Sequence, residues 1–110
     1  MPKARAYSRY NTEALSLLGK QIKLGRKQRK WTEIELAERA GISRATLQKI
    51  EKGDATCAIG LVFEVAILVG LKLFEADKFP LDKQVSNADE KIALLPKAIH
   101  KKHKVVDDDF

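Results

Sequence analysis

The segment 32–53 constrains the fold more than any other part of the chain, because it carries signals for two short helices and for the turn between them. Thr32 with Glu35 three residues later is a capping box, which marks the start of a helix. Gly41 can end that helix because glycine adopts a positive φ at little cost, and Ser43 can cap the helix that follows. The segment therefore predicts two helices whose connecting turn is too tight to leave them much freedom.

Apolar and polar residues lie on opposite faces of both predicted helices. The apolar residues expected to face the interior are Leu36, Ala37, Ala40, Leu47 and Ile50. The second helix would then expose Arg44, Ala45, Gln48, Lys49 and Lys52. This face suits the floor of a DNA major groove, since arginine can pair with a guanine edge, glutamine with an adenine edge, and alanine can touch a thymine methyl group. An ordinary helical hairpin with a solvated polar face would show the same spacing.

A longer pattern surrounds these two helices. It consists of LGKQIKLGRKQRKWT at 18–32, ELA at 35–37, AGIS at 40–43 and IEKG at 50–53. The pattern resembles the Xre/Cro-CI helix-turn-helix family over about residues 18–74. The resemblance implies an all-α fold, a five-helix lambda-repressor-like domain that binds DNA and usually works as a dimer.

The same resemblance implies which residues contact DNA. The positions of the family's recognition-helix contacts are occupied here by Ser43, Arg44, Ala45, Gln48 and Lys49. Thr32 and Glu33 match the start of the preceding helix, which usually meets a phosphate. Glu33 departs from the usual Gln or Ser, so its side chain would bring a negative charge to that contact, although its backbone N–H could still serve.

The resemblance also implies one structural ion pair. Arg26 and Glu51 match an arginine and a glutamate that join the first and third helices of the family. We expect this pair to be partly buried and to fix the recognition helix, because removing one partner would leave a poorly solvated charge.

The first helix should run from about Thr12 to Arg29, with Asn11 as its cap. Gly19 and Gly25 lie inside it. Each glycine weakens the helix by roughly 1 kcal/mol relative to alanine, so packing against other helices must hold it.

Positive charge is concentrated at the start of the chain. The net charge is +6, and residues 1–30 contain nine Lys or Arg and one acidic residue. Such a block attracts phosphates with an affinity that falls as salt rises. A solubilising face is the alternative, but the block stands beside the predicted recognition helix, which favours DNA.

Several classes of protein do not fit the sequence. No apolar run approaches the ~20 residues of a membrane span. The basic N-terminus has no apolar core after it, so we expect that it is not a signal peptide. The single Cys57 excludes an internal disulfide and fits the cytoplasm. We find no phosphate-binding loop, no nucleophile with a base and no paired carboxylates, so we expect neither an enzyme nor a cofactor. His100 and His103 have a spacing that could hold a metal, but no further ligand completes the set, so no metal site is expected.

The chain is expected to comprise three parts. Residues 1–11 form a flexible basic arm, and residues 12–79 form the helix-turn-helix domain. Residues 80–110 form a C-terminal tail, which either binds a partner or is a disordered end. Within the domain, the segment Ile59–Val69 is apolar on more than one face, so one side should meet a second subunit. A short fifth helix or an extended piece should begin at Leu71.

The tail carries two further signals. Asn87-Ala88-Asp89-Glu90 resembles a helix start, and Pro96 would interrupt that helix after one or two turns. Leu94-Leu95-Pro96-Lys97 and the ending Asp107-Asp108-Asp109-Phe110 are similar to antitoxins that accompany HipA-type kinase toxins. This shorter resemblance implies a protein that represses its own operon and restrains a toxin kinase.

These signals together predict a sequence-specific regulator, a repressor, that binds double-stranded DNA as a homodimer on a palindromic operator. An antitoxin role beside a HipA-like kinase is the more specific hypothesis. Two alternatives stay open: an Xre-type regulator with no toxin partner, and a helical protein-interaction domain that does not bind DNA.

Overall fold

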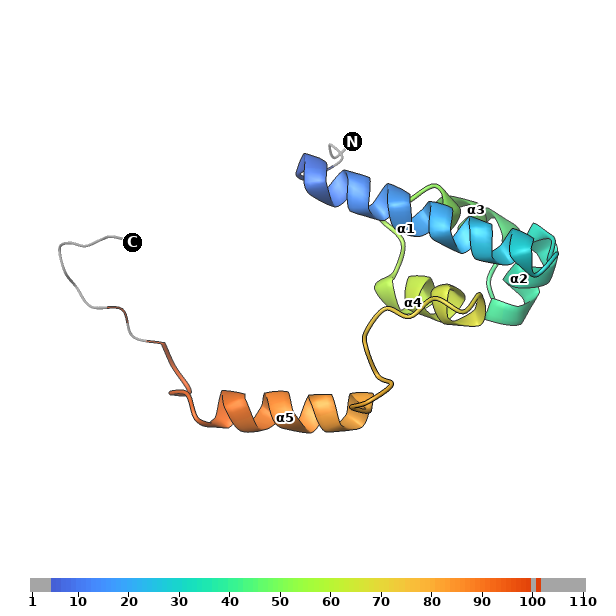
Figure 1. Cartoon of the computed structure of the whole chain (residues 1–110). Helices are drawn as coiled ribbons and strands as arrows, with labels where there is room; N and C mark the ends of the chain where they lie inside the picture. Colours follow the sequence, from blue (N-terminus) through green and yellow to red (C-terminus); the bar gives the residue numbers. More distant parts are fainter. Residues whose placement is uncertain (1–4, 100, 102–110) are drawn as a thin grey trace. The chain divides into compact units, whose positions relative to one another are not determined.

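The computed structural model describes residues 5–99 and 101, and within this part of the chain there are five α-helices and no strand (Figure 1). The helices are α1 (Arg9–Gln28), α2 (Glu33–Ala40), α3 (Arg44–Glu51), α4 (Ile59–Leu68) and α5 (Leu81–Ala93). The predicted all-α, five-helix class is therefore confirmed. None of the described helices combines the length and the apolar character that crossing a membrane would require.

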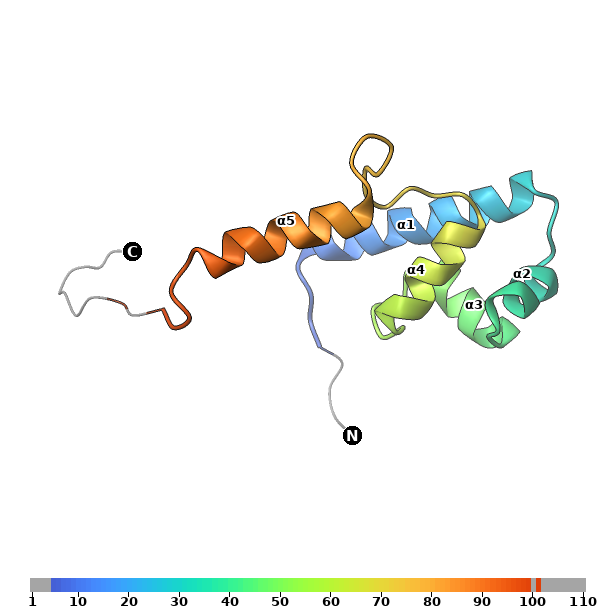
Figure 2. The same ribbon diagram turned by 90° about the horizontal axis from the view of Figure 1, so that it is seen from below.

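The chain divides into two compact units, one up to Leu73 and one from Phe74 onward. The first unit holds α1 to α4, in which α2 contacts both α3 and α4 while α1 contacts α3 (Figure 2). The division expected from the sequence, with a boundary after Phe79, stays a prediction. The second unit holds α5 and is described below by itself.

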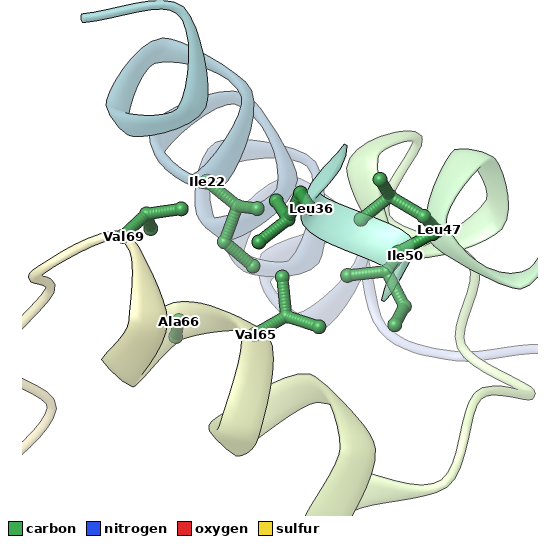
Figure 3. Close-up of a cluster of buried hydrophobic side chains, with 8 residues drawn as sticks. Ile22, Leu36, Leu47, Ile50, Val65, Ala66 and Val69 are labelled. Carbon is green, nitrogen blue, oxygen red and sulfur yellow. The ribbon is translucent and has the colours of Figure 1, made fainter. Parts of the chain in front are cut away.

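Side chains from all four helices of the first unit meet in one small core. Ile22, Leu36, Leu47 and Val65, each from a different helix, are fully buried and point toward one another (Figure 3). Ala37, Ile50, Ala66 and Val69 complete the buried set. The predicted apolar faces of α2 and α3 are confirmed, with Ala40 packed partly buried against the core. The core therefore fixes which side of α3 can face outward.

Helix α1 begins at Arg9, earlier than predicted. Ser8 has extended backbone angles, and its Oγ accepts a hydrogen bond of 3.1 Å from the backbone N–H of Asn11. The prediction that Asn11 caps a helix beginning near Thr12 was wrong. Both residues are good caps, and nothing between them breaks a helix, so the upstream cap adds another turn.

Gly19 lies where α1 crosses the C-terminal end of α3. A Cβ atom built on Gly19 would lie 2.5 Å from the carbonyl oxygen of Glu51 and 2.8 Å from that of Ile50. No real Cβ approaches backbone atoms so closely, so the crossing depends on glycine. The residue that weakens α1 as a helix therefore allows it to pack on α3.

Of the two alternatives predicted for the segment after α4, the short helix from Leu71 does not form. Gly70 has a φ of 86°, and the chain then continues without an α-helix to Pro80, so no fifth helix begins at Leu71. The fifth helix is α5, which begins at Leu81, earlier than the start expected near Asn87.

Pro80 is the N-cap of α5, and its missing N–H leaves one donor fewer to be satisfied at the start of the helix. The side-chain amide of Gln84 supports the first turn of α5 by donating to the carbonyl oxygens of Phe79, at 2.7 Å, and of Glu75. None of the residues of α5 is buried.

Candidate nucleic-acid interface

The turn between α2 and α3 has the local geometry that its sequence predicts. The Thr32 hydroxyl accepts from the Glu35 backbone N–H at 3.1 Å, and the Glu35 carboxylate accepts from the Thr32 backbone N–H at 2.8 Å. Gly41 follows α2 with a φ of 70°, in the left-handed region. The Ser43 Oγ accepts from the Thr46 backbone N–H at 3.0 Å and so caps α3. Caps and turn together hold the two eight-residue helices at one angle.

The predicted DNA-contacting residues of the recognition helix lie on the outer side of α3. Ser43, Arg44, Ala45 and Lys49 are exposed, whereas Gln48 is half-buried. The opposite side of the helix holds the buried Leu47 and Ile50. The Ser43 hydroxyl is already engaged, because besides capping α3 it donates to the Thr46 Oγ1 at 2.9 Å.

Glu33 contacts two of these residues. Its Oε1 accepts a hydrogen bond of 2.8 Å from the Arg44 Nε and one of 3.0 Å from the Gln48 Nε2. The Arg44 hydrogen bond, followed by that of Gln48, lowers the pKa of the Glu33 carboxyl, which therefore stays ionised. The sequence analysis missed this cluster, because the partners are 11 and 15 residues from Glu33 and no local pattern joins them.

Arg26 and Glu51 lie in direct contact between α1 and α3. The Arg26 Nε donates to the Glu51 Oε2 at 2.7 Å, and the Arg26 Nη2 donates to Oε1 at 3.1 Å. The Arg26 Nη1 also donates to the Trp31 carbonyl oxygen at 3.0 Å. Both charged residues are buried, with exposed fractions of 6% and 8%. The Glu51 hydrogen bond raises the pKa of Arg26, while burial opposes it.

An open hollow of about 390 Å³ lies at the start of α2. Lys23 and Lys27 from α1 line it together with Thr32, Glu33 and Arg44. The first turn of α2 adds the positive end of its helix dipole. Basic side chains and a helix N-terminus are the usual components of a phosphate contact.

Other candidate sites do not gain support. Among the residues that the structure describes, no three His, Cys, Asp or Glu side chains are placed to hold a metal ion. His100, His103 and the ending Asp107–Phe110 lie outside the described residues, as do residues 1–4. Cys57 is half-buried, and burial raises the pKa of its thiol.

Comparison with known proteins connects this geometry to a family. A helix-turn-helix family model matches residues 22–75. A solved HipB–O2 20mer complex is similar to this chain at 26% identity and a TM-score of 0.50, covering 69% of this chain and 97% of that chain. A HipA–HipB–O2–O3 complex is similar at 27% identity and the same TM-score, covering 68% and 97%. No curated protein matches.

Proposed function

Because this chain carries a DNA-binding domain of the Xre-type helix-turn-helix family, we propose that it is a sequence-specific repressor that places α3 in the major groove of double-stranded DNA. The placement of α3 is the observation that supports this proposal. Its inner side is held in the core by Leu47 and Ile50, so its outer side is presented at a fixed angle.

In this proposal some residues contact base edges and others contact phosphates. Those that read base edges are Arg44, Ala45, Gln48 and Lys49. Ser43 and Thr32 act at the helix starts, where backbone N–H groups and their hydroxyls meet phosphates. Lys23 and Lys27 beside the hollow add phosphate contacts that position the protein but carry no sequence information.

Nuclease protection across a salt series tests this function. We expect the protein to protect a defined site in the DNA upstream of its own gene. Arg44→Ala and Lys49→Ala should each weaken binding by about 1–3 kcal/mol if the residue reads a base. Lys91→Ala on the exposed face of α5 is the control and should change little. Unchanged operator affinity in both α3 variants would defeat the assignment, and the absence of any protected site would favour a helical interaction domain that does not bind DNA.

The exposed apolar side chains on the outer side of α4 support the proposal of a homodimer. Ile59 and Ile67 are 71% and 60% exposed, although neighbouring Val65 and Ala66 are buried in the core. We propose that a second copy covers these side chains, which would give two recognition helices for two half-sites of a palindromic operator, about 34 Å apart. Ile67→Lys should yield a monomer in analytical ultracentrifugation. A variant that stays dimeric would exclude this surface as the interface.

The similarity to HipB favours one biological setting. The solved relatives include HipB with O2 and HipB with HipA. We propose by analogy that this chain is a cytoplasmic antitoxin that represses its own operon and binds a HipA-like toxin kinase through residues 80–110. Co-purification of a neighbouring gene product only when residues 81–110 are present would support this role. A genomic setting without a toxin-like neighbour would leave a stand-alone Xre-type regulator.

A further inference from the structure

The Glu33 carboxylate joins α2 to Arg44 and Gln48 of α3. Glu33 is largely covered, with 26% of its side chain exposed, whereas Arg44 is 59% exposed. One oxygen atom accepts from both Arg44 and Gln48, so the two partners cannot move independently without leaving that oxygen. We propose that Glu33 is a positioning residue for specificity: it presents Arg44 and Gln48 to DNA as one reading unit. The inference rests on the proposed DNA-binding function.

The hydrogen bonds to Glu33 leave other donors and acceptors of Arg44 and Gln48 free to contact bases. Arg44 uses its Nε for Glu33, which leaves the two terminal nitrogens, Nη1 and Nη2, for the O6 and N7 acceptors of a guanine. Gln48 uses one hydrogen of Nε2, which leaves the second hydrogen and the side-chain carbonyl for the N7 and N6 groups of an adenine. The carboxylate thus fixes the orientation of both groups and still leaves each a bidentate edge.

The charge of Glu33 adds a second effect. On a wrong sequence, an Arg44 side chain that turns toward a phosphate and away from Glu33 would leave the ionised carboxylate unpaired beside a polyanion. Lys23, Lys27 and Arg26 line the same hollow and moderate this repulsion. Even so, the carboxylate should weaken non-specific binding more than operator binding, which widens the ratio between the two.

Glu33→Gln tests the inference, because it keeps the shape and an acceptor oxygen but removes the charge. The affinities of the full chain for the operator and for a scrambled duplex of equal length are measured at several salt concentrations. We expect the variant to bind the scrambled duplex more tightly, so that the specificity ratio falls about tenfold. The salt slope for the scrambled duplex should steepen by about 1, since Arg44 becomes free to contact a phosphate.

Glu38→Gln is the matched control, because it makes the same charge change at an exposed residue of the same helix. An equal fall of the ratio in both variants would reduce the effect to net charge and overturn the inference, as would an unchanged ratio in Glu33→Gln. If instead both affinities and the melting temperature fall together, Glu33 has only a structural role. A wild-type protein that prefers no duplex would refute the proposed function itself, which is a separate result.

Discussion

At the scale of single residues, burial decides what an ion pair contributes. The Arg26–Glu51 pair is buried, and Arg26 uses three of its nitrogens for the Glu51 carboxylate and the Trp31 carbonyl. The pair links α1 to the end of α3, so it supports the helix proposed to read DNA. The Arg9–Glu13 pair has a longer contact of 3.5 Å, and its side chains are 91% and 68% exposed.

Replacing Glu51 with alanine should therefore be strongly destabilising. The change leaves the buried Arg26 guanidinium without its carboxylate, and breaking such a pair from one side costs about 3–5 kcal/mol. In a domain of this size the melting temperature should fall by more than about 10 °C. Thermal unfolding followed by circular dichroism measures the shift.

Glu13→Ala removes the exposed pair and provides the comparison. Its effect should stay within about 0.5 kcal/mol, because solvent screens exposed pairs and side-chain entropy opposes them. Similar melting temperatures for the two variants would contradict the structural role assigned to Arg26 and Glu51.

At the scale of secondary-structure elements, the crossing of α1 over α3 determines the effect of Gly19. Helix propensity alone predicts that Gly19→Ala stabilises α1 by about 1 kcal/mol. The structure predicts the opposite sign, since the added Cβ would lie 2.5 Å from the Glu51 carbonyl oxygen and push the helices apart. Urea unfolding should show a clear loss of stability.

Gly60→Ala in α4 separates the effect of helix propensity from the effect of a steric clash. No atom outside its own neighbourhood lies within 4 Å of a Cβ built there, so only the propensity term remains. This variant should be neutral or more stable by up to about 1 kcal/mol. A stabilised Gly19→Ala protein would show that α1 and α3 do not approach as closely as described.

The start of α2 should respond to acid in a defined direction. Hydrogen bonds from Thr32, first from its backbone N–H, lower the pKa of the Glu35 carboxyl below its ordinary value of 4.5. The ionised carboxylate therefore stabilises the fold above pH 4.5, and this contribution is lost as pH falls through the lowered value. The stability difference between the wild type and Glu35→Ala should be largest near pH 7 and shrink toward pH 3. A difference that is constant with pH would contradict the capping role of Glu35.

The secondary-structure elements also show which features could be predicted from the sequence. The capping box, the glycine after α2 and the Ser43 cap are local signals, and each appears in the structure as predicted. The Glu33 cluster joins residues that only the tertiary fold brings together, so periodicity could not reveal it. The start of α1 was misplaced because Ser8 and Asn11 are equally good caps. The start of α5 was misplaced because its N-cap, Pro80, has no side-chain oxygen that would mark the beginning of a helix.

At the scale of the whole molecule, the two compact units differ in how many of their side chains are buried. Every residue of the apolar core lies at or before Leu73, whereas α5 contains no buried residue. Its exposed apolar side chains recur at helical spacing and include Leu81, Val85 and Ile92. A 13-residue helix is marginally stable by itself in water. The described core of the first unit is therefore complete without residues of the second.

Ending the chain after Phe79 should separate two activities. Because the core and the outer face of α3 remain, the melting temperature and the operator affinity should stay close to those of the full chain. Capture of a co-expressed HipA-like kinase should be lost, since the proposed partner-binding segment is removed. Leu81→Asp with Val85→Asp in the full chain is the finer test, because these changes remove the apolar side of α5 and retain the chain length. Kinase capture that survives both changes would place the contact in the helix-turn-helix domain, and an operator affinity that falls with the truncation would show that the second unit contributes to DNA binding.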